Sequence, residues 1–332
     1  MFNKDDKMKR STTTSLVLAV LLTFTSALAE AGLVSFATYT GAVAVSTDGF
    51  GNVADDGIIS ASVPTGSTVL GAYLYTATSG GAPTGSVTFA GNIVTFPTVF
   101  ANSPPCCPDF FHTGRADVTS IVAPLIGGGG ALPFDFTISD GSSTEVDGQA
   151  LVVVYSNPLL STSTVAIMNG GQALTGDTFT VTFASPVDPT APGFFAEMRL
   201  GDSYSCCGQE STVVVNGTTI STHAGNNDDG TGGTSNGQLI TVGGFDDPFS
   251  PFLPSYEDDH ERYDLSPYMS VGDTTLTVFT SNPSLDDNIF LAVFHLTGEA
   301  TVTTNPVPEP ASFLLFGSGL AGLAAWRMRK KV

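Results

Sequence analysis

Ala150–Tyr155 reads ALVVVY, and Ile289–Phe294 reads IFLAVF. Each run is continuously apolar and is bounded by polar or glycine-containing segments. A short apolar run without alternation is typical of a β-strand that is buried on both of its faces. The two runs therefore predict two strands whose faces are both covered by other parts of the fold.

Other segments alternate between apolar and polar residues. Phe134–Ser139 reads FDFTIS, Thr178–Phe183 reads TFTVTF and Thr275–Thr280 reads TLTVFT. A period of two places the apolar side chains on one face of a strand and turns the threonines towards water. Clusters of Gly and Asn, such as those at 127–130 and 226–233, separate the segments. This arrangement is typical of antiparallel sheets joined by turns.

The composition of residues 30–305, the body of the chain, points the same way. The body has no Trp, and Gly, Thr, Ser, Val and Phe are prominent, which favours strands over helices. It holds three arginines, no lysine and 28 acidic residues, and so carries a net charge of −25. Such a surface repels nucleic acid and attracts cations. A nucleic-acid-binding function is therefore excluded.

The body also shows a weak internal duplication, with four matches in the same order in its two halves. The matched segments are 86–91 with 212–217, 115–118 with 262–265, 134–140 with 275–282, and 147–154 with 287–294. We therefore predict an all-β protein with two related antiparallel β-sandwich units of jelly-roll or Ig-like type. The predicted limits are 30–173 for the first unit and 174–305 for the second.

Gly148–Tyr155 reads GQALVVVY and follows the Arg115/Asp117 turn. At these residues the chain resembles a β-sandwich repeat of bacterial and archaeal surface proteins. The second half departs from the pattern at Asn288-Ile289, where the likeness is weaker. The resemblance supports the fold and implies no activity.

The two ends of the chain carry processing signals. Lys4, Lys7, Lys9 and Arg10 precede the apolar segment 15–24, and Ala27 and Ala29 occupy the positions that a signal peptidase reads. Residues 1–29 are therefore predicted to be a signal peptide with a helical apolar segment, cleaved before Glu30. An uncleaved anchor is the alternative, but the apolar run is short for one.

At the other end, Pro308-Glu309-Pro310 precedes an uncharged run of 16 residues, Ala311–Trp326. As a helix this run would be about 24 Å long, which is short for a bilayer core of about 30 Å. Four basic residues follow it and would stay on the cytoplasmic side of the membrane. They are Arg327, Arg329, Lys330 and Lys331.

Residues 306–332 resemble the PEP-CTERM sorting tail of Gram-negative bacteria. The resemblance implies a short transmembrane helix, recognition and cleavage by an exosortase, and an inner-membrane intermediate. The mature protein would then reach the cell surface or extracellular matrix. An ordinary single-pass anchor would explain the apolar run but not the Pro-Glu-Pro sequence.

Four cysteines occur as two adjacent pairs, Cys106-Cys107 and Cys206-Cys207. An even number in an exported protein predicts disulfides. Two vicinal bridges are one possibility, and either of two crosswise arrangements joining the halves is the other. We favour crosslinking, because a vicinal bridge strains the intervening peptide. Adjacent cysteines do not have the usual spacing of zinc ligands.

The charged residues offer two candidate sites. Arg115/Asp117 and Arg262/Asp264 form a repeated pair, which either fixes a turn or shares a ligand. The segment 246–264 is rich in carboxylates, and oxygen ligands of this kind bind Ca²⁺, although no EF-hand loop is present. A solvated acidic surface is the alternative. The candidate calcium ligands are Asp246, Asp247, Asp258 and Asp259.

We find no convergent catalytic set. The G-x-S-x-G pentapeptide at 233–237 lies in a Gly/Asn-rich loop rather than between a strand and a helix, as a nucleophile elbow requires. The four histidines lack metal-ligand spacing. Aromatic platforms for sugars could come from Tyr73 and Tyr75, Phe110 and Phe111, or Phe249 and Phe252.

The sequence therefore predicts an exported, non-catalytic protein of the cell envelope or extracellular matrix with a structural or adhesive role. A carbohydrate-binding module for extracellular polysaccharide is the alternative, and a hydrolase is the third possibility. Exosortase and signal peptidase are the expected processing partners, and Ca²⁺ is the only cofactor suggested.

Overall fold

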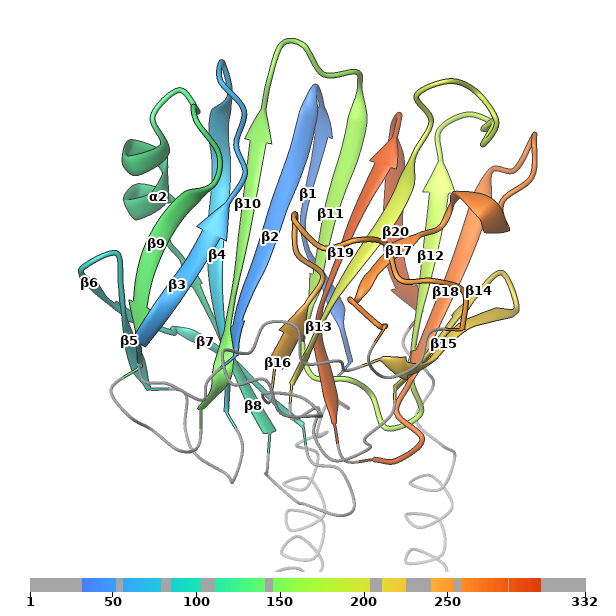
Figure 1. Ribbon diagram of the computed structural model, residues 1–332. Coiled ribbons are helices and arrows are strands. Elements are labelled where there is room, and N and C mark those ends of the chain that lie inside the picture. The colour runs from blue at the N-terminus through green and yellow to red at the C-terminus, as the bar shows by residue number, and fades with distance from the viewer. Residues whose placement is uncertain are drawn as a thin grey trace, which may run out of the picture. The chain divides into compact units, whose positions relative to one another are not determined.

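The computed structural model describes residues 32–51, 56–78, 85–102, 111–140, 146–203, 211–224, 240–253, 258–285 and 287–305. These residues form four antiparallel sheets with one α-helix, so the all-β prediction is confirmed (Figure 1). The predicted signal and transmembrane helices lie outside the described residues. Among the residues that are described, no helix has the length and hydropathy needed to cross a bilayer.

Sheets B and C form a first sandwich, built from the first half of the chain. Sheet B has the strand order β2 (Val43–Gly51), β10 (Val146–Ser156), β4 (Thr68–Thr78), β8 (Phe111–Asp117) and β7 (Thr98–Asn102). Sheet C has the order β3 (Asp56–Ala61), β9 (Phe134–Ser139), β5 (Ser86–Phe89) and β6 (Asn92–Thr95). The helix α2 (Thr119–Ile126) follows β8 and buries Val122 and Ile126 in the same core.

Sheets A and D form a second sandwich. Sheet A has the order β1 (Val34–Gly41), β11 (Ser163–Asn169), β19 (Asn288–Thr297), β13 (Ala196–Ser203) and β16 (Ile240–Val242), with β17 (Arg262–Asp264) also paired to β13. Sheet D has the order β15 (Thr218–Ala224), β14 (Ser211–Val215), β18 (Thr275–Ser281), β12 (Asp177–Phe183) and β20 (Ala300–Asn305). A short 3₁₀-helix, η1 (Ser266–Tyr268), follows β17.

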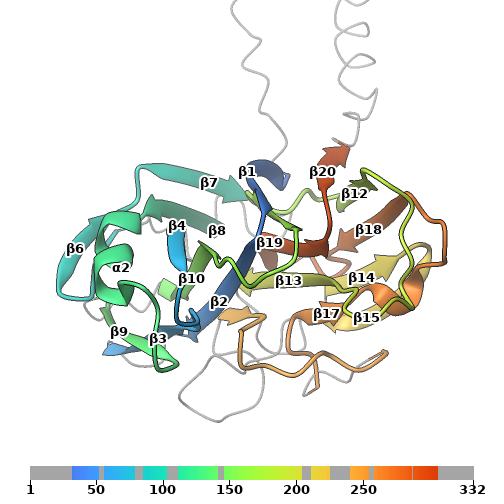
Figure 2. The same ribbon diagram turned by 90° about the horizontal axis from the view of Figure 1, so that it is seen from above.

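Three hydrophobic cores separate four layers, in the order C, B, A, D (Figure 2). Sheets B and C share the first core, sheets B and A share the second, and sheets A and D share the third. Sheets A and B therefore have apolar side chains on both faces. All described residues of β10 except Ser156 are buried, and in β19 only His295 and Thr297 are less than fully buried. The prediction of two strands covered on both faces is confirmed.

The two sandwiches have equivalent strand orders. In the inner sheets, β2-β10-β4-β8 corresponds to β11-β19-β13-β17, and in the outer sheets, β3-β9-β5-β6 corresponds to β12-β18-β14-β15. The four sequence matches fall on corresponding elements. The first match is a hairpin in both halves, with Ala90-Gly91 and Asn216-Gly217 all at positive φ. Such two-residue turns suit the twist of a β-hairpin.

The match of 147–154 with 287–294 is out of register. Asp117 pairs with Tyr73 on β4 as Asp264 pairs with Glu197 on β13, which makes Tyr73 and Glu197 equivalent. Tyr73 then faces Val152 on β10, whereas Glu197 faces His295 on β19. The match of 147–154 with 287–294 is therefore wrong by three residues, although the strands correspond.

The second sandwich is not formed by the predicted second unit alone. Strands β1 and β11 lie within residues 30–173, but both are hydrogen-bonded into sheet A of the second sandwich. The chain therefore passes between the sandwiches twice, at Ala42 between β1 and β2 and at 157–162 between β10 and β11. The unit limits 30–173 and 174–305 stay a prediction.

Candidate functional site

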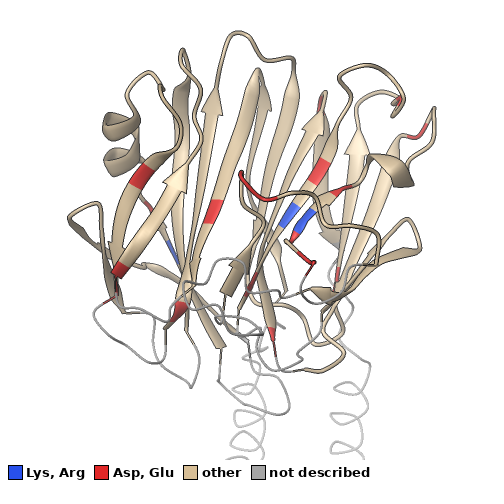
Figure 3. Ribbon diagram, viewed as in Figure 1, with Lys and Arg blue, Asp and Glu red and all other residues tan. Residues whose placement is uncertain are grey.

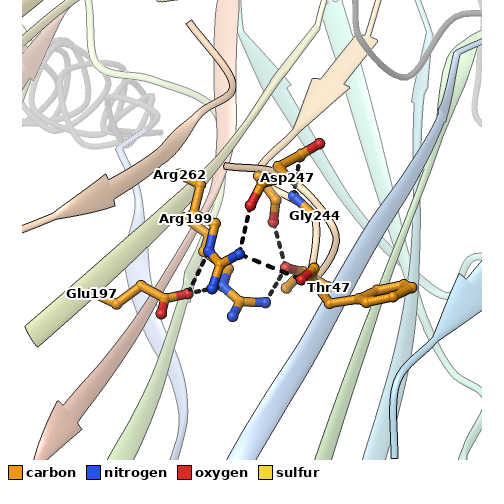
Figure 4. Close-up of polar contacts among 8 residues, drawn as sticks. Thr47, Glu197, Arg199, Gly244, Asp247 and Arg262 are labelled. Carbon is orange, nitrogen blue, oxygen red and sulfur yellow. Dashed lines mark hydrogen bonds and ion pairs between the residues drawn. The ribbon is translucent and has the colours of Figure 1, made fainter. Parts of the chain in front are cut away.

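A cluster of charged side chains lies where β13 and β17 of sheet A face β2 of sheet B (Figure 4). Glu197 and Arg199 are two residues apart on β13 and share one face, and Arg262 pairs with Arg199 from β17. Arg199 Nε donates a hydrogen bond to Glu197 Oε1, and Arg262 Nε donates to the same oxygen at 3.2 Å. Glu197 is 7% exposed and Arg199 is 5% exposed. We call these three residues, with Thr47, the Arg199 cluster.

Thr47 connects this cluster to the first sandwich. Arg199 Nη1 donates to Thr47 Oγ1 on β2 at 2.9 Å, and this hydroxyl donates in turn to the carbonyl oxygen of Gly243. The amide of Phe245 donates to the carbonyl oxygen of Thr47 at 2.9 Å. The cluster therefore joins sheet A, sheet B and the loop that follows β16.

Arg262 holds the same loop from the other side. Its Nη1 donates to the carbonyl oxygens of Asp247 at 2.6 Å and Phe245 at 3.3 Å. Its guanidinium carbon lies 4.6 Å from the centre of the Phe249 ring, within the range of a cation–π contact. Within the loop 243–249, Asp247 Oδ2 accepts the amide hydrogen of Gly244 at 2.5 Å. The loop is thus held by its backbone carbonyls, one ring and the Asp247 carboxylate.

The electrostatics of the cluster favour its charged form. Burial alone would raise the pKa of Glu197, but the two arginines outweigh burial and hold this pKa below its usual value. Burial lowers the pKa of Arg199, and Glu197 opposes that change. Burial also lowers the pKa of His295, opposite Glu197 on β19, to about 4, so this imidazole is neutral at pH 7. The arrangement is a buried ion-pair triad beside a neutral histidine.

Arg115, at the position equivalent to Arg262, also bridges the two inner sheets. It extends from β8 of sheet B and donates through Nη1 to Asn169 Oδ1 on β11 of sheet A. Its guanidinium carbon lies 3.5 Å from the centre of the Phe36 ring on β1. Arg115 therefore contacts the opposite inner sheet, whereas Arg262 contacts Glu197 and the loop 243–249.

The aspartates of the repeated motif fix turns, as one of the two sequence interpretations expects. Asp117 Oδ1 accepts the amide hydrogen of Thr119 at 2.9 Å, and Asp264 Oδ1 accepts that of Ser266 at 3.0 Å. In the part of the chain that the structure describes, neither aspartate forms an ion pair with its own arginine. The shared-ligand interpretation of the two pairs stays a prediction.

The acidic segment 246–264 is divided between surface and core. Asp246 and Asp258 are exposed, whereas Asp259 is fully buried. The Asp259 carboxylate accepts hydrogen bonds from the Ser221, Ser250 and Tyr263 hydroxyls and from the amide of Glu261. Burial raises its pKa, and these donors oppose that change. Asp259 is thus an acceptor inside the second sandwich.

No three His, Cys, Asp or Glu side chains among the described residues are grouped closely enough to hold a metal ion. The calcium prediction for Asp246, Asp247, Asp258 and Asp259 therefore has no geometric support there and stays a prediction.

A pair of buried acidic residues lies where β13 ends and β19 begins. Asp202 and Asp287 are both fully buried. Asp202 Oδ1 accepts the amide hydrogen of Asn288 at 3.1 Å, and Asp287 Oδ2 accepts a hydrogen bond from Ser211 Oγ at 2.8 Å. Burial and the neighbouring Asp287 carboxyl raise the pKa of Asp202 well above its usual value. The pair contributes to packing at this end of the second sandwich.

A cavity of about 510 Å³ lies away from these clusters, at the second sandwich. It is formed by the loop between β12 and β13, the turn between β19 and β20, and Ser161. Phe183 and Phe194 supply apolar surface, and Asp188 and Glu299 supply carboxylates. The lining contains no lysine or arginine. The cavity falls within the size range of small-ligand sites.

Phe110 lies outside the described residues, and of the other members of the three aromatic pairs suggested for sugar binding only Phe249 and Phe252 are exposed. Tyr73 and Tyr75 are buried between sheets A and B, and Phe111 is 1% exposed. Phe249 and Phe252 are 45% and 61% exposed. They lie in the loop region after β16 rather than on a sheet face, so no aromatic strip runs along a sheet among the described residues.

Several predicted site residues lie outside the described residues. They are Ala27, Ala29, Cys106, Cys107, Cys206, Cys207, Pro308, Glu309, Pro310, Arg327, Arg329, Lys330 and Lys331, together with the pentapeptide 233–237. The disulfide pairing and the signal-peptidase site stay predictions.

Sequence reasoning missed Glu197, Arg199 and Thr47. The described residues contain three arginines and no lysine, while acidic residues occur in both sandwiches (Figure 3). The scarcity of cations was the available signal, because each arginine inside so acidic a chain needs a defined acidic or aromatic partner. Nothing in the sequence identified Glu197 as that partner.

Comparison with known families decides the nature of the C-terminal end. The family described as the PEP-CTERM protein-sorting motif matches residues 306–330. This end of the chain is a PEP-CTERM sorting motif. The PEP-CTERM motif implies an exported protein that an exosortase processes, with membrane-linked sorting to the cell surface.

The comparisons add nothing on the body. No curated protein and no solved structure matches the chain. The likeness of residues 148–155 to surface-protein repeats therefore stays a prediction, and the function of the double sandwich rests on its own geometry.

Proposed function

We propose that this PEP-CTERM protein is a non-catalytic component of the cell envelope or extracellular matrix of a Gram-negative bacterium, with a structural or adhesive role. The single observation that carries the proposal is the Arg199 cluster, which joins both sandwiches. Its residues bond to one another, to β2 and to the loop 243–249. Because these charges are buried and paired with one another, they support a role in joining the two sandwiches.

The proposed route to the surface has two cleavages. Signal peptidase removes residues 1–29 after export through the inner membrane. The tail then holds the protein as a membrane intermediate until the exosortase acts near Pro308. The acidic body, with its net charge of −25, stays soluble outside the cell by self-repulsion.

A hydrolase is the less favoured function. Glycoside hydrolysis requires a carboxylic acid whose pKa is raised, so that it can protonate the leaving group. At the cavity, the hydrogen bonds from Thr190 lower the pKa of Asp188 instead. That environment suits an ionised acceptor of hydrogen bonds.

A carbohydrate-binding role is the second candidate, and the cavity favours it. Apolar rings can pack against the C–H face of a sugar, and carboxylates can accept hydrogen bonds from its hydroxyl groups. The sugar would come from extracellular polysaccharide.

The test uses a strain that contains an exosortase and compares three genotypes: a deletion of the gene, the full chain, and a chain lacking residues 306–330. We expect the full chain to restore attachment or matrix cohesion, and the shortened chain to be lost from the cell-surface fraction. Equal cohesion in all three strains would contradict the structural role. Release of reducing sugar from a polysaccharide by the exported protein would contradict the non-catalytic proposal.

A further inference from the structure

The walls of the cavity at the second sandwich are fixed by backbone hydrogen bonds. The amide of Val187 donates to Asp273 O at 2.9 Å, and the amide of Gly272 donates back to Val187 O at 2.8 Å. On the other wall, the amide of Ala184 donates to Glu299 O at 2.9 Å. The loop between β12 and β13 is therefore bound to both neighbouring segments. A preformed cavity of this kind loses little conformational entropy when a ligand binds.

The two carboxylates of the lining differ in how they are held. Asp188 Oδ1 accepts hydrogen bonds from the amide and the hydroxyl of Thr190, at 2.9 and 2.6 Å, which orients the group and keeps it ionised. Glu299 is exposed, and within the described part of the chain its side chain makes no hydrogen bond or ion pair. The lining thus offers one fixed and one adaptable acceptor.

The remaining lining is apolar or hydroxyl-bearing. Phe183 forms buried apolar surface and is 5% exposed, and Phe194, Pro186 and Pro192 add further apolar surface. Ser161 and Ser185 add hydroxyl groups. A ligand that fits this lining needs an apolar face and several hydroxyl donors at its edge.

We propose that this cavity binds a neutral sugar unit of a polysaccharide. The sugar's C–H face would lie against the Phe and Pro side chains, and its hydroxyl groups would donate to Asp188 and Glu299. This inference rests on the proposed surface location, because it places the polysaccharide outside the cell.

Charge selects among the sugars. Two carboxylates and no cation line the cavity, and the whole chain has a net charge of −20. A uronic acid or sulfated sugar would be repelled by both. A simple cation would be attracted to acidic groups over the whole body and would leave the apolar lining unused. The neutral sugar uses both parts of the lining.

The experiment uses the exported protein isolated from the cell-surface fraction. Calorimetry is run with four neutral probes, cellobiose, maltose, lactose and diacetylchitobiose, and with glucuronic acid and arginine as charged probes. We expect saturable binding of at least one neutral probe and none of glucuronic acid. Saturable binding of arginine alone, or of no probe at all, would overturn the proposal.

Variants locate the site. Asp188→Asn combined with Glu299→Gln should raise the dissociation constant of the neutral sugar by about tenfold or more, since hydrogen bonds to charged groups are lost. Ala191→Trp should abolish binding by filling the cavity. Asp135→Asn is the matched control, because this exposed carboxylate lies on β9 in sheet C and accepts a hydrogen bond from Ser60. An equal effect of the control would overturn the assignment.

The two proposals fail separately. Loss of sugar binding with normal surface retention would remove only the cavity assignment. Normal sugar binding by a protein that makes no contribution to attachment or cohesion would remove the structural role and leave the cavity assignment in place.

Discussion

The Arg199 cluster gives the sharpest test of how the two sandwiches are held together. Glu197→Ala would leave Arg199, which is 5% exposed, and the half-buried Arg262 without their shared carboxylate. Removing one partner of a buried ion pair costs about 3–5 kcal/mol, because the remaining charge stays buried and unpaired. At about 2 °C per kcal/mol for a domain of this size, the melting temperature at pH 7 should fall by about 6–10 °C.

Three further measurements separate this effect from general surface electrostatics. The lower melting temperature of Glu197→Ala should persist in high salt, because salt screens buried ion pairs only weakly. The lowered pKa of Glu197 contributes stability that is present above its unfolded pKa and is lost as the pH falls through the folded pKa. The difference in free energy of unfolding between the wild type and Glu197→Ala should therefore become smaller below about pH 4. The double variant with Arg199→Ala should lose less than the sum of the single losses.

The control for this experiment is Glu299→Gln, which removes an exposed carboxylate without a hydrogen-bonded partner in the described part of the chain. Its free energy of unfolding should change by no more than about 0.5 kcal/mol. The control should therefore melt within about 1 °C of the wild type. If Glu197→Ala also melts within about 1 °C of the wild type, the cluster does not hold the sandwiches together.

Four other outcomes are expected. Burial, opposed by the hydrogen bond from the Ser60 amide, raises the pKa of Asp48 to about 7. The contribution of Asp48 to stability is therefore fully present below about pH 4 and is lost as the pH rises through about 7. Asp48→Asn should stabilise the protein more at about pH 8 than at about pH 4, and an equal effect at both pH values would contradict this. Asp259→Asn should lower the melting temperature with or without Ca²⁺, because Asp259 is a buried hydrogen-bond acceptor. A saturable rise of the melting temperature with Ca²⁺ but not with Mg²⁺, lost in Asp246→Asn, would support a calcium site. Non-reducing peptide mapping should join the Cys106 region to the Cys206 region, and vicinal bridges alone would refute crosslinking. The intact mass of the surface form should lack the apolar tail, and its retention would replace sorting by permanent anchoring.

The pattern of apolar residues predicted which strands are covered on one face and which on both. The alternating segments 134–139, 178–183 and 275–280 became strands of the outer sheets C and D. The continuous runs 150–155 and 289–294 became the centres of β10 and β19 in the inner sheets. This part of the fold was predictable because strand periodicity reports directly how many faces meet other protein.

The same pattern misleads at β13. Residues 196–200 read AEMRL, an alternation that predicts one face towards water. In the structure, Ala196, Met198 and Leu200 face sheet D as expected, but Glu197 and Arg199 are also buried. Their partners lie at Thr47 and Arg262, far away in the sequence. Alternation cannot distinguish a face covered by water from a face covered by matched charges.

The duplication explains where the arginines lie, and the difference between the halves explains why one partner is acidic. Arg115 and Arg262 come from equivalent strands. Arg115 contacts the opposite inner sheet, and Arg262 contacts Glu197 and the loop 243–249. In the second half the neighbouring β13 position holds Glu197, whereas its β4 equivalent is Tyr73.

Each arginine therefore needs a different kind of partner. Arg115 lies against the ring of Phe36 and bonds to the Asn169 side chain, so aromatic and amide groups accept its charge. Arg262 shares the Glu197 carboxylate with Arg199. In the first half, Tyr75 occupies the position equivalent to Arg199. A second cation on β13 requires a full negative charge beside it, since ring contacts of about 0.5–2 kcal/mol cannot offset the burial of two like charges. The second half therefore needs Glu197 because Arg199 lies beside Arg262. The first half needs no carboxylate there, because Tyr75 takes the place of Arg199.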